Sequence, residues 1–116
     1  MQKGIGIDII EIDRVKAAVK QYKDKFLRKI FTERELEYCK NRRAIRFPEL
    51  AARFAAKEAY SKAIGTGLRG IRWKDIEVLN EKSGKPRLFI KKKVDNNISV
   101  SLSHSKKYAT AVVLVS

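Results

Sequence analysis

The segment FAAKEAYSKAIG, from Phe54 to Gly65, is the stretch around which the rest of the chain is expected to fold. Its alanines favour a helix, Pro48 upstream suits a first helical turn, and Gly65 provides a stop. At about 100° per residue, one side of this helix is apolar and mostly small, and can pack closely on another element. That side carries Ala52, Ala56, Tyr60, Ala59, Ala63 and Ile64. The sequence therefore predicts a long central helix.

Glu58 and Lys62 lie on the opposite side of this predicted helix. Glu followed by Lys four residues later is the spacing of an ordinary surface ion pair, worth about 0.2–0.5 kcal/mol. However, the neighbours of Glu58 on the helical wheel are small or apolar, namely Ala51, Phe54, Ala55 and Gly65. They suggest a partly enclosed carboxylate, which needs a partner or a metal. Both interpretations stay open at this point.

The composition indicates one basic domain. A chain of 116 residues is long enough for one core, so residues 1–116 are expected to form a single domain. The 27 basic and 13 acidic residues leave a formal charge of +14, which implies an acidic partner. Nucleic acid, a membrane surface, a polyphosphorylated small molecule and an acidic protein all fit.

The single cysteine, Cys39, cannot form an internal disulfide, which fits a reducing, cytoplasmic setting. Near the N-terminus, Asp8 and Glu11 interrupt the only apolar run before it reaches the length of a signal-peptide core or a membrane span. We therefore expect a soluble, untargeted protein.

The segment GIGIDII, from Gly4 to Ile10, alternates isoleucines with Gly4, Gly6 and Asp8, which is typical of a strand. Because glycines share the face of Asp8, a ligand, a metal or another backbone could approach that face closely. The alternative is an edge strand whose charged face is exposed.

Local patterns predict the remaining elements. A helix begins near Asp13, and the capping box Thr32–Glu35 starts another that ends near Lys40, followed by a basic loop at residues 41–47. The arginines of this loop could hold phosphate or simply keep the loop soluble.

Strands are predicted at residues 75–79, 87–90, 98–104 and 108–115, with a turn at 83–86 and a polar connection at 91–97. The last strand is apolar on both faces and should be central or buried in an assembly. Together these patterns predict an α+β domain with a mostly antiparallel sheet packed against the central helix.

The residues that could carry chemistry are few. His104 is the only histidine, no nucleophile elbow is present, and one histidine with one cysteine does not make a zinc site. Asp8 and Glu58, among many cations, have the composition of a magnesium and polyphosphate site.

Four blocks of the sequence resemble the holo-[acyl-carrier-protein] synthases, a family of 4′-phosphopantetheinyl transferases. The blocks are GIGIDIIEIDRV, RFAAKEAYSKAIGTG, SGKP and VSLSHSKKYATAVVLV, in the family's order and spacing. The resemblance implies the 4′-phosphopantetheinyl transferase fold and a magnesium-dependent reaction. In it, 4′-phosphopantetheine passes from coenzyme A to a serine of apo acyl carrier protein, leaving adenosine 3′,5′-bisphosphate. It also implies homotrimers with active sites at subunit interfaces.

The resemblance further implies roles for individual residues. Asp8 and Glu58 would bind magnesium, Lys62 would reach the pyrophosphate, and Glu58 or a water on the metal would accept the serine proton. The residues expected at coenzyme A are Arg46, Arg53, Lys62, Gly65 and His104, with Gly84 and Pro86 contributed by the neighbouring chain. Arg14 and the first helix would meet the carrier protein. The sequence departs from the family at residues 91–97, where relatives usually carry a longer segment.

Two other interpretations compete with the enzyme. The charge of +14 would suit a small basic nucleic-acid-binding module, although the basic residues are dispersed and no zinc-finger or RRM signature is present. A partner protein with a dead site would bind coenzyme A without turnover. We favour the enzyme, with neither nucleic acid nor a membrane as its partner.

Overall fold

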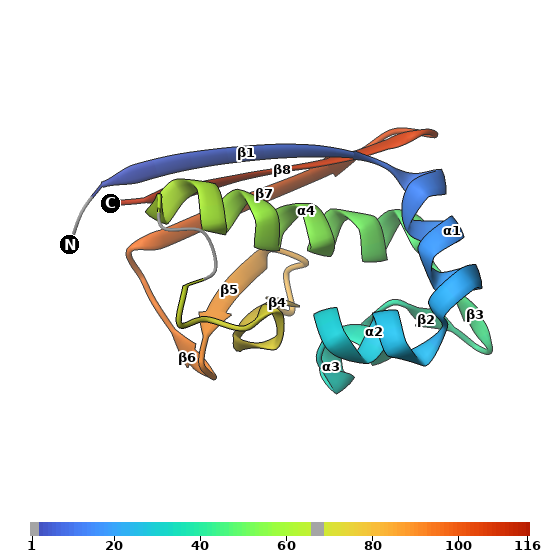
Figure 1. The fold of residues 1–116 in the computed structure, drawn as a ribbon. Helices are drawn as coiled ribbons and strands as arrows, with labels where there is room; N and C mark the ends of the chain where they lie inside the picture. Colours follow the sequence, from blue (N-terminus) through green and yellow to red (C-terminus); the bar gives the residue numbers. More distant parts are fainter. Residues whose placement is uncertain (1–2, 66–68) are drawn as a thin grey trace.

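The computed structural model describes residues 3–65 and 69–116, and a single long helix runs through its centre (Figure 1). This helix, α4 (Phe47–Ile64), begins with proline in its first turn and ends at Gly65, which adopts the left-handed conformation with φ 76°. The predicted central helix is therefore confirmed. It is buried on most sides rather than along one stripe, because Ala51, Arg53, Ala55 and Lys57 are buried as well as Ala52, Ala56 and Ala59 of the predicted apolar side.

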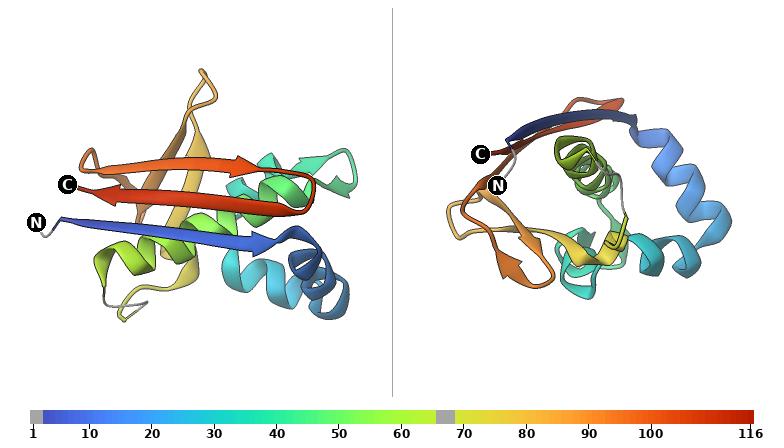
Figure 2. Two further views of the ribbon diagram at one scale, coloured as in Figure 1. Left: turned by 90° about the horizontal axis from the view of Figure 1, so that it is seen from above. Right: turned by 60° about the vertical axis from the view of Figure 1, so that its left-hand side comes forward.

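Two antiparallel sheets flank α4 (Figures 1 and 2). The first has the order β1-β8-β7 and is formed by β1 (Gly4–Glu11), β8 (Tyr108–Val115) and β7 (Ile98–His104). The second has the order β4-β5-β6 and is formed by β4 (Ile76–Asn80), β5 (Pro86–Ile90) and β6 (Lys93–Val94). The predicted α+β class and the central position of the last strand are confirmed. The strands divide into separate sheets, which local patterns did not indicate.

Three short helices cover the end of the molecule where α4 begins. They are α1 (Ile12–Tyr22), α2 (Asp24–Ile30) and α3 (Glu33–Tyr38), and the 3-10 turn η1 (Trp73–Asp75) leads into β4. The predicted capping box is present, since Thr32 and Glu35 exchange hydrogen bonds at the start of α3. Apolar side chains of α1, α2 and α3 pack on Leu50, Ala51 and Ala52 of α4 and form one half of the core.

Two segments predicted to lack strands contain short ones. The basic loop at residues 41–47 includes β3 (Ala44–Ile45), which pairs with β2 (Lys40–Asn41). The polar connection at residues 91–97 includes β6, which pairs with β5 through a turn where Lys91 and Lys92 have positive φ. Both predictions were wrong because strands of two residues are too short to show an alternating pattern.

Strand β1 lies directly against α4 through its glycines. A Cβ atom added to Gly4 or Gly6 would overlap the carbonyl oxygen of Ala63 or Ala59. Of the alternatives for this strand face, close approach of another backbone is therefore the one observed. The opposite face, with Ile5, Ile7 and Ile9, is 64–68% exposed. Within the described ranges, none of the helices combines the length and apolar character needed to cross a membrane.

Candidate functional site

Asp8 and Glu58, fifty residues apart in the sequence, line the same pocket. The pocket has a volume of about 610 Å³ and lies where β1 passes into α1 beside the middle of α4. Lys62 and Arg14 line it too. Asp8 reaches it because Gly4 and Gly6 let β1 approach α4 closely, on the face that carries Asp8. The structure thus brings together both predicted metal ligands, the predicted pyrophosphate-binding lysine and the predicted carrier-binding arginine.

Lys62 binds the N-terminal strand rather than its own helix. Its Nζ lies 3.2 Å from Asp8 Oδ1 and 3.1 Å from the carbonyl oxygen of Ile7. The interpretation of Glu58 and Lys62 as a simple surface pair within one helix is therefore not what the structure shows. Instead, the Lys62 ammonium places a positive charge beside the Asp8 carboxylate, in the pocket that Asp8 and Glu58 line.

The environment of Glu58 suits a divalent cation. Burial raises the pKa of Glu58, the nearby Asp8 carboxylate raises it further, and Lys62 opposes this only in part. Two carboxylates that repel each other need a cation, and hard oxygen donors suit Mg²⁺. In residues 3–65 and 69–116, no group of three or more His, Cys, Asp and Glu side chains is placed to hold a metal. Mg²⁺ tolerates such a sparse set, because water and substrate phosphates complete its coordination.

A second group of predicted site residues gathers at the other side of α4. We call it the arginine cluster and define it as Arg46, Glu49, Arg53, Asn80, Gly84 and His104. His104 Nε2 lies 3.5 Å from Glu49 Oε1, and Arg53 Nη1 donates to the Glu49 carbonyl oxygen at 3.2 Å. Arg53 Nη2 also donates to Asn80 Oδ1, and Asn80 Nδ2 donates to the Gly84 carbonyl oxygen. Glu49 and Asn80, which the sequence did not single out, connect the predicted residues.

Arg53 is an internal member of this cluster. Its side chain is 1% exposed, and its guanidinium lies 4.1 Å from the centroid of the Tyr38 ring. The Arg46 guanidinium lies 4.8 Å from the same ring. A cation over an aromatic ring is stabilised by the ring's negative face. Arg53 is therefore placed to support its neighbours, whereas the less buried Arg46 and the exposed His104 can meet a ligand directly.

The remaining predicted residues lie near the ends of elements. Pro86 lines a small pocket of about 240 Å³ with Lys85, Arg87 and residues of β7. Gly65 caps α4 one turn beyond Lys62. None of the residues predicted at coenzyme A, apart from Lys62, is among those that line the pocket of Asp8 and Glu58. One chain therefore presents the acids and the arginine cluster as separate groups.

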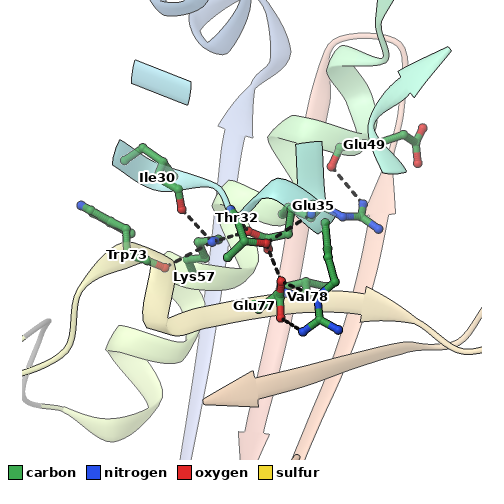
Figure 3. Close-up of polar contacts among 10 residues, drawn as sticks. Ile30, Thr32, Glu35, Glu49, Lys57, Trp73, Glu77 and Val78 are labelled. Carbon is green, nitrogen blue, oxygen red and sulfur yellow. Dashed lines mark hydrogen bonds and ion pairs between the residues drawn. The ribbon is translucent and has the colours of Figure 1, made fainter. Parts of the chain in front are cut away.

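Lys57, next to Glu58, is held in the interior by a network that the sequence did not predict (Figure 3). Its Nζ lies 2.6 Å from Glu35 Oε1 and 2.7 Å from the carbonyl oxygen of Ile30. Glu35 Oε2 accepts a hydrogen bond from the Val78 amide at 2.8 Å. Burial lowers the pKa of Lys57, and the adjacent Glu35 opposes this. The network joins α2, α3, α4 and β4 behind the acidic pocket.

The sequence as a whole matches a known family. Residues 4–113 match the profile of the 4′-phosphopantetheinyl transferase superfamily. The chain belongs to this superfamily. Within it, the chain is 47% identical over 116 residues to the holo-[acyl-carrier-protein] synthase of Chloroherpeton thalassium, covering 96% of this chain and 95% of the relative. The predicted family and the predicted enzyme class are thereby confirmed.

Solved phosphopantetheinyl transferases share the fold. The holo-[acyl-carrier-protein] synthase of Helicobacter pylori, in complex with coenzyme A, superposes with a TM-score of 0.84 at 33% identity and covers 97% of this chain and 99% of its own. The synthase of Bacillus anthracis str. Ames, in complex with CoA (3′,5′-ADP), gives a TM-score of 0.80 at 43% identity, covering 97% and 94%. The predicted 4′-phosphopantetheinyl transferase fold is confirmed.

Proposed function

We propose that this holo-[acyl-carrier-protein] synthase transfers 4′-phosphopantetheine from coenzyme A to a serine of apo acyl carrier protein and requires magnesium. The products are holo carrier protein and adenosine 3′,5′-bisphosphate. The observation that carries this proposal is the convergence of Asp8, Glu58 and Lys62 in one pocket. The complexes of the two relatives with coenzyme A or its nucleotide portion support coenzyme A as the donor.

Asp8 and Glu58 would hold the magnesium ion, since their oxygens are the ligands it prefers. Magnesium supplies charge neutralisation, which offsets the repulsion between an anionic pyrophosphate and an oxygen nucleophile. Burial and the neighbouring Asp8 carboxylate raise the pKa of Glu58, and a cation held between the two carboxylates would offset their repulsion.

The side chains of the pocket supply the rest of the reaction. The serine oxygen forms a bond to the phosphorus that carries pantetheine, and the bond from that phosphorus to the bridging oxygen breaks. Lys62, with its ammonium 3.2 Å from Asp8, stabilises the charge left on the departing nucleotide. Glu58, or a water beside it, would accept the serine proton, since Glu58 is a carboxylate of the same pocket as Lys62.

Mass spectrometry of an apo carrier protein tests this proposal. After incubation with the chain, coenzyme A and magnesium, the carrier should gain one phosphopantetheine, and EDTA should prevent the gain. Asp8→Ala and Glu58→Gln should abolish transfer while far-UV circular dichroism stays unchanged, and Glu37→Gln, an exposed glutamate on α3, should behave as wild type. Near-normal transfer by either acid variant would refute the assignment.

Coenzyme A would lie between two copies of the chain. The sequence assigned only Gly84 and Pro86 to the neighbouring chain. Because Gly84 is linked through Asn80 to Arg53, the acids of one copy and the whole arginine cluster of the next would form one site in a homotrimer, which agrees with their separation within a single chain. The exposed isoleucines of β1 offer an apolar face for this assembly. A homotrimer explains both features together.

The carrier protein would dock on α1. Arg14 lines the acidic pocket, and Lys16 and Lys20 are exposed on the same helix. Electrostatic docking of an acidic carrier should raise the association rate and weaken with salt. Arg14→Glu should therefore raise the KM for the carrier at low salt, whereas Lys93→Glu, on the distant β6, should not. An unchanged KM in Arg14→Glu would exclude this surface.

A cytoplasmic location fits the thiol of Cys39, which is free and buried. Burial raises the pKa of this thiol to about 11, so that it stays protonated and unreactive at neutral pH. Subcellular fractionation would test the location.

A further inference from the structure

Asn80, the last residue of β4, joins two parts of the arginine cluster that are far apart in the sequence. Its Oδ1 accepts a hydrogen bond from Arg53 Nη2, and its Nδ2 donates to the Gly84 carbonyl oxygen at 2.8 Å. One carboxamide thus connects a buried side chain of α4 with the turn between β4 and β5.

The other contacts of this turn lie within the β4–β5 hairpin: the strand pairing ends at Asn80 and Pro86, and Arg87 Nη1 lies 3.3 Å from Glu81 Oε1. Residues 81–85 are exposed, and Gly84 has φ 93°, a conformation in which glycine is freer than other residues. Two backbone hydrogen bonds, Glu81 N to Lys85 O and Gly84 N to Glu81 O, close the turn on itself. These bonds lie within the hairpin, whereas the Asn80 carboxamide connects the turn to Arg53 of α4.

Arg53 is a suitable anchor. Its side chain is 1% exposed, stacks on Tyr38 and also donates to the Glu49 carbonyl oxygen. The Glu49 side chain in turn lies beside His104. A group held to Arg53 is therefore held in a defined position relative to His104. At the end of the turn, Lys85 and Pro86 form a wall of the small pocket between β5 and β7.

We propose that Asn80 is a positioning residue for coenzyme A. By tying the Gly84 carbonyl group to Arg53, it fixes the Glu81–Pro86 turn as the wall against which coenzyme A packs. This inference rests on the proposed function and deepens it, because it names a residue that acts on donor affinity through the turn and not on the reacting atoms.

Two substitutions separate the hydrogen bonds of Asn80. Asn80→Asp keeps an oxygen that can accept from Arg53 and loses the donor to Gly84. Asn80→Leu loses both and adds no charge. Asn97→Asp, at an exposed position before β7, is the matched control. For each variant we would measure the KM for coenzyme A, the KM for the carrier, kcat, the Kd of coenzyme A by calorimetry, and hydrogen exchange of residues 81–85.

Both Asn80 variants should raise the KM and Kd for coenzyme A about fivefold to tenfold, the effect of one lost hydrogen bond. The carrier's KM and kcat should change less than about twofold, amides of residues 81–85 should exchange faster, and Asn97→Asp should match wild type. Because Asn80→Asp retains the partner of Arg53, its melting temperature should stay close to that of wild type.

Three outcomes would overturn the inference: unchanged affinity for coenzyme A, a loss confined to kcat, or a loss in Asn80→Asp with none in Asn80→Leu, which would indicate charge repulsion. If one variant fails to fold, hydrogen exchange of residues 81–85 and the affinity for coenzyme A in the other variant still test the inference. If wild type binds coenzyme A but transfers nothing, the proposed function fails, while the binding and exchange data still test Asn80.

Discussion

Lys57 and Glu35 form an ion pair with no exposed side-chain surface. Taking two charges out of water costs several kcal/mol per ion, so such a pair persists only where its other polar atoms have partners. Here the carbonyl oxygen of Ile30 and the amide of Val78 supply them. Because Lys57 directly precedes Glu58, the pair sets the rotation of α4 about its axis and thereby directs Glu58 into the acidic pocket.

Breaking this ion pair should make the folded protein less stable. We expect Lys57→Met, which leaves Glu35 charged and buried, to lower the free energy of unfolding by about 3–5 kcal/mol. Urea unfolding followed by circular dichroism measures this. The double variant Glu35→Leu/Lys57→Met should lose less than the sum of the single losses, because neither charge is then left alone. Arg28→Met, which breaks an exposed pair with Glu33, is the control and should leave the urea midpoint almost unchanged. Additive losses would contradict a coupled pair.

At the residue scale, the sequence indicates which side chains share a site better than it indicates which charged side chains are buried. Asp8, Glu58 and Lys62 could be singled out because motif and charge point the same way, and the structure places all three at one pocket. Glu35 could be predicted only as a cap of α3, since its contact with Lys57 depends on how α3 packs over α4 and β4. The burial of Lys57 could have been inferred from its place among Ala55, Ala56 and Ala59, where a lysine has little room to reach solvent.

At the scale of elements, the contact between β1 and α4 decides where the acids meet. Alternation predicts that β1 is a strand, but an isoleucine face would ordinarily be expected inside, and here it is exposed. The inner face belongs to Gly4 and Gly6, which allow the strand backbone to touch α4. Sequence patterns could not decide this, because the choice depends on a second element with small residues at matching positions, Ala59 and Ala63.

Filling this contact should move Asp8. In Gly6→Ala the new methyl group would overlap the Ala59 carbonyl oxygen, so β1 must shift, at a cost of about 1–3 kcal/mol. Since a displacement of about 1 Å can cost 100-fold in rate, transfer should fall at least tenfold at temperatures where the variant is folded. Gly70→Ala is the control: Gly70 has positive φ but no neighbour within 4 Å, so its strain should lower stability without slowing transfer. A folded Gly6→Ala with normal kcat would show that β1 does not set the geometry of the acids.

At the scale of the whole molecule, the outer face of the first sheet lacks a covering layer within the described chain (Figure 2). Ile5 pairs with Leu114 and Ile7 with Val112 across this face, and Ile5, Ile7, Ile9 and Leu114 are all 49% exposed or more. The α+β class could be predicted from sequence because each element has a local signal. What covers this apolar face could not be predicted, because no pattern within one chain indicates the contacts that the proposed homotrimer would make.

If sites form between copies, two defective variants should restore each other. Asp8→Ala lacks an acid but keeps its arginine cluster, whereas Arg46→Ala/His104→Ala keeps its acids. Neither should transfer phosphopantetheine alone at limiting coenzyme A. After the two are unfolded together and refolded in equal amounts, random assembly puts an intact acid pair beside an intact cluster in about one quarter of interfaces, so about one quarter of wild-type activity should return.

Ile7→Glu introduced into both variants, which places a charge in the apolar face, should prevent this recovery and lower the mass measured by light scattering. Each site would lie within a single chain if the refolded mixture stayed inactive while the mass remained that of a trimer.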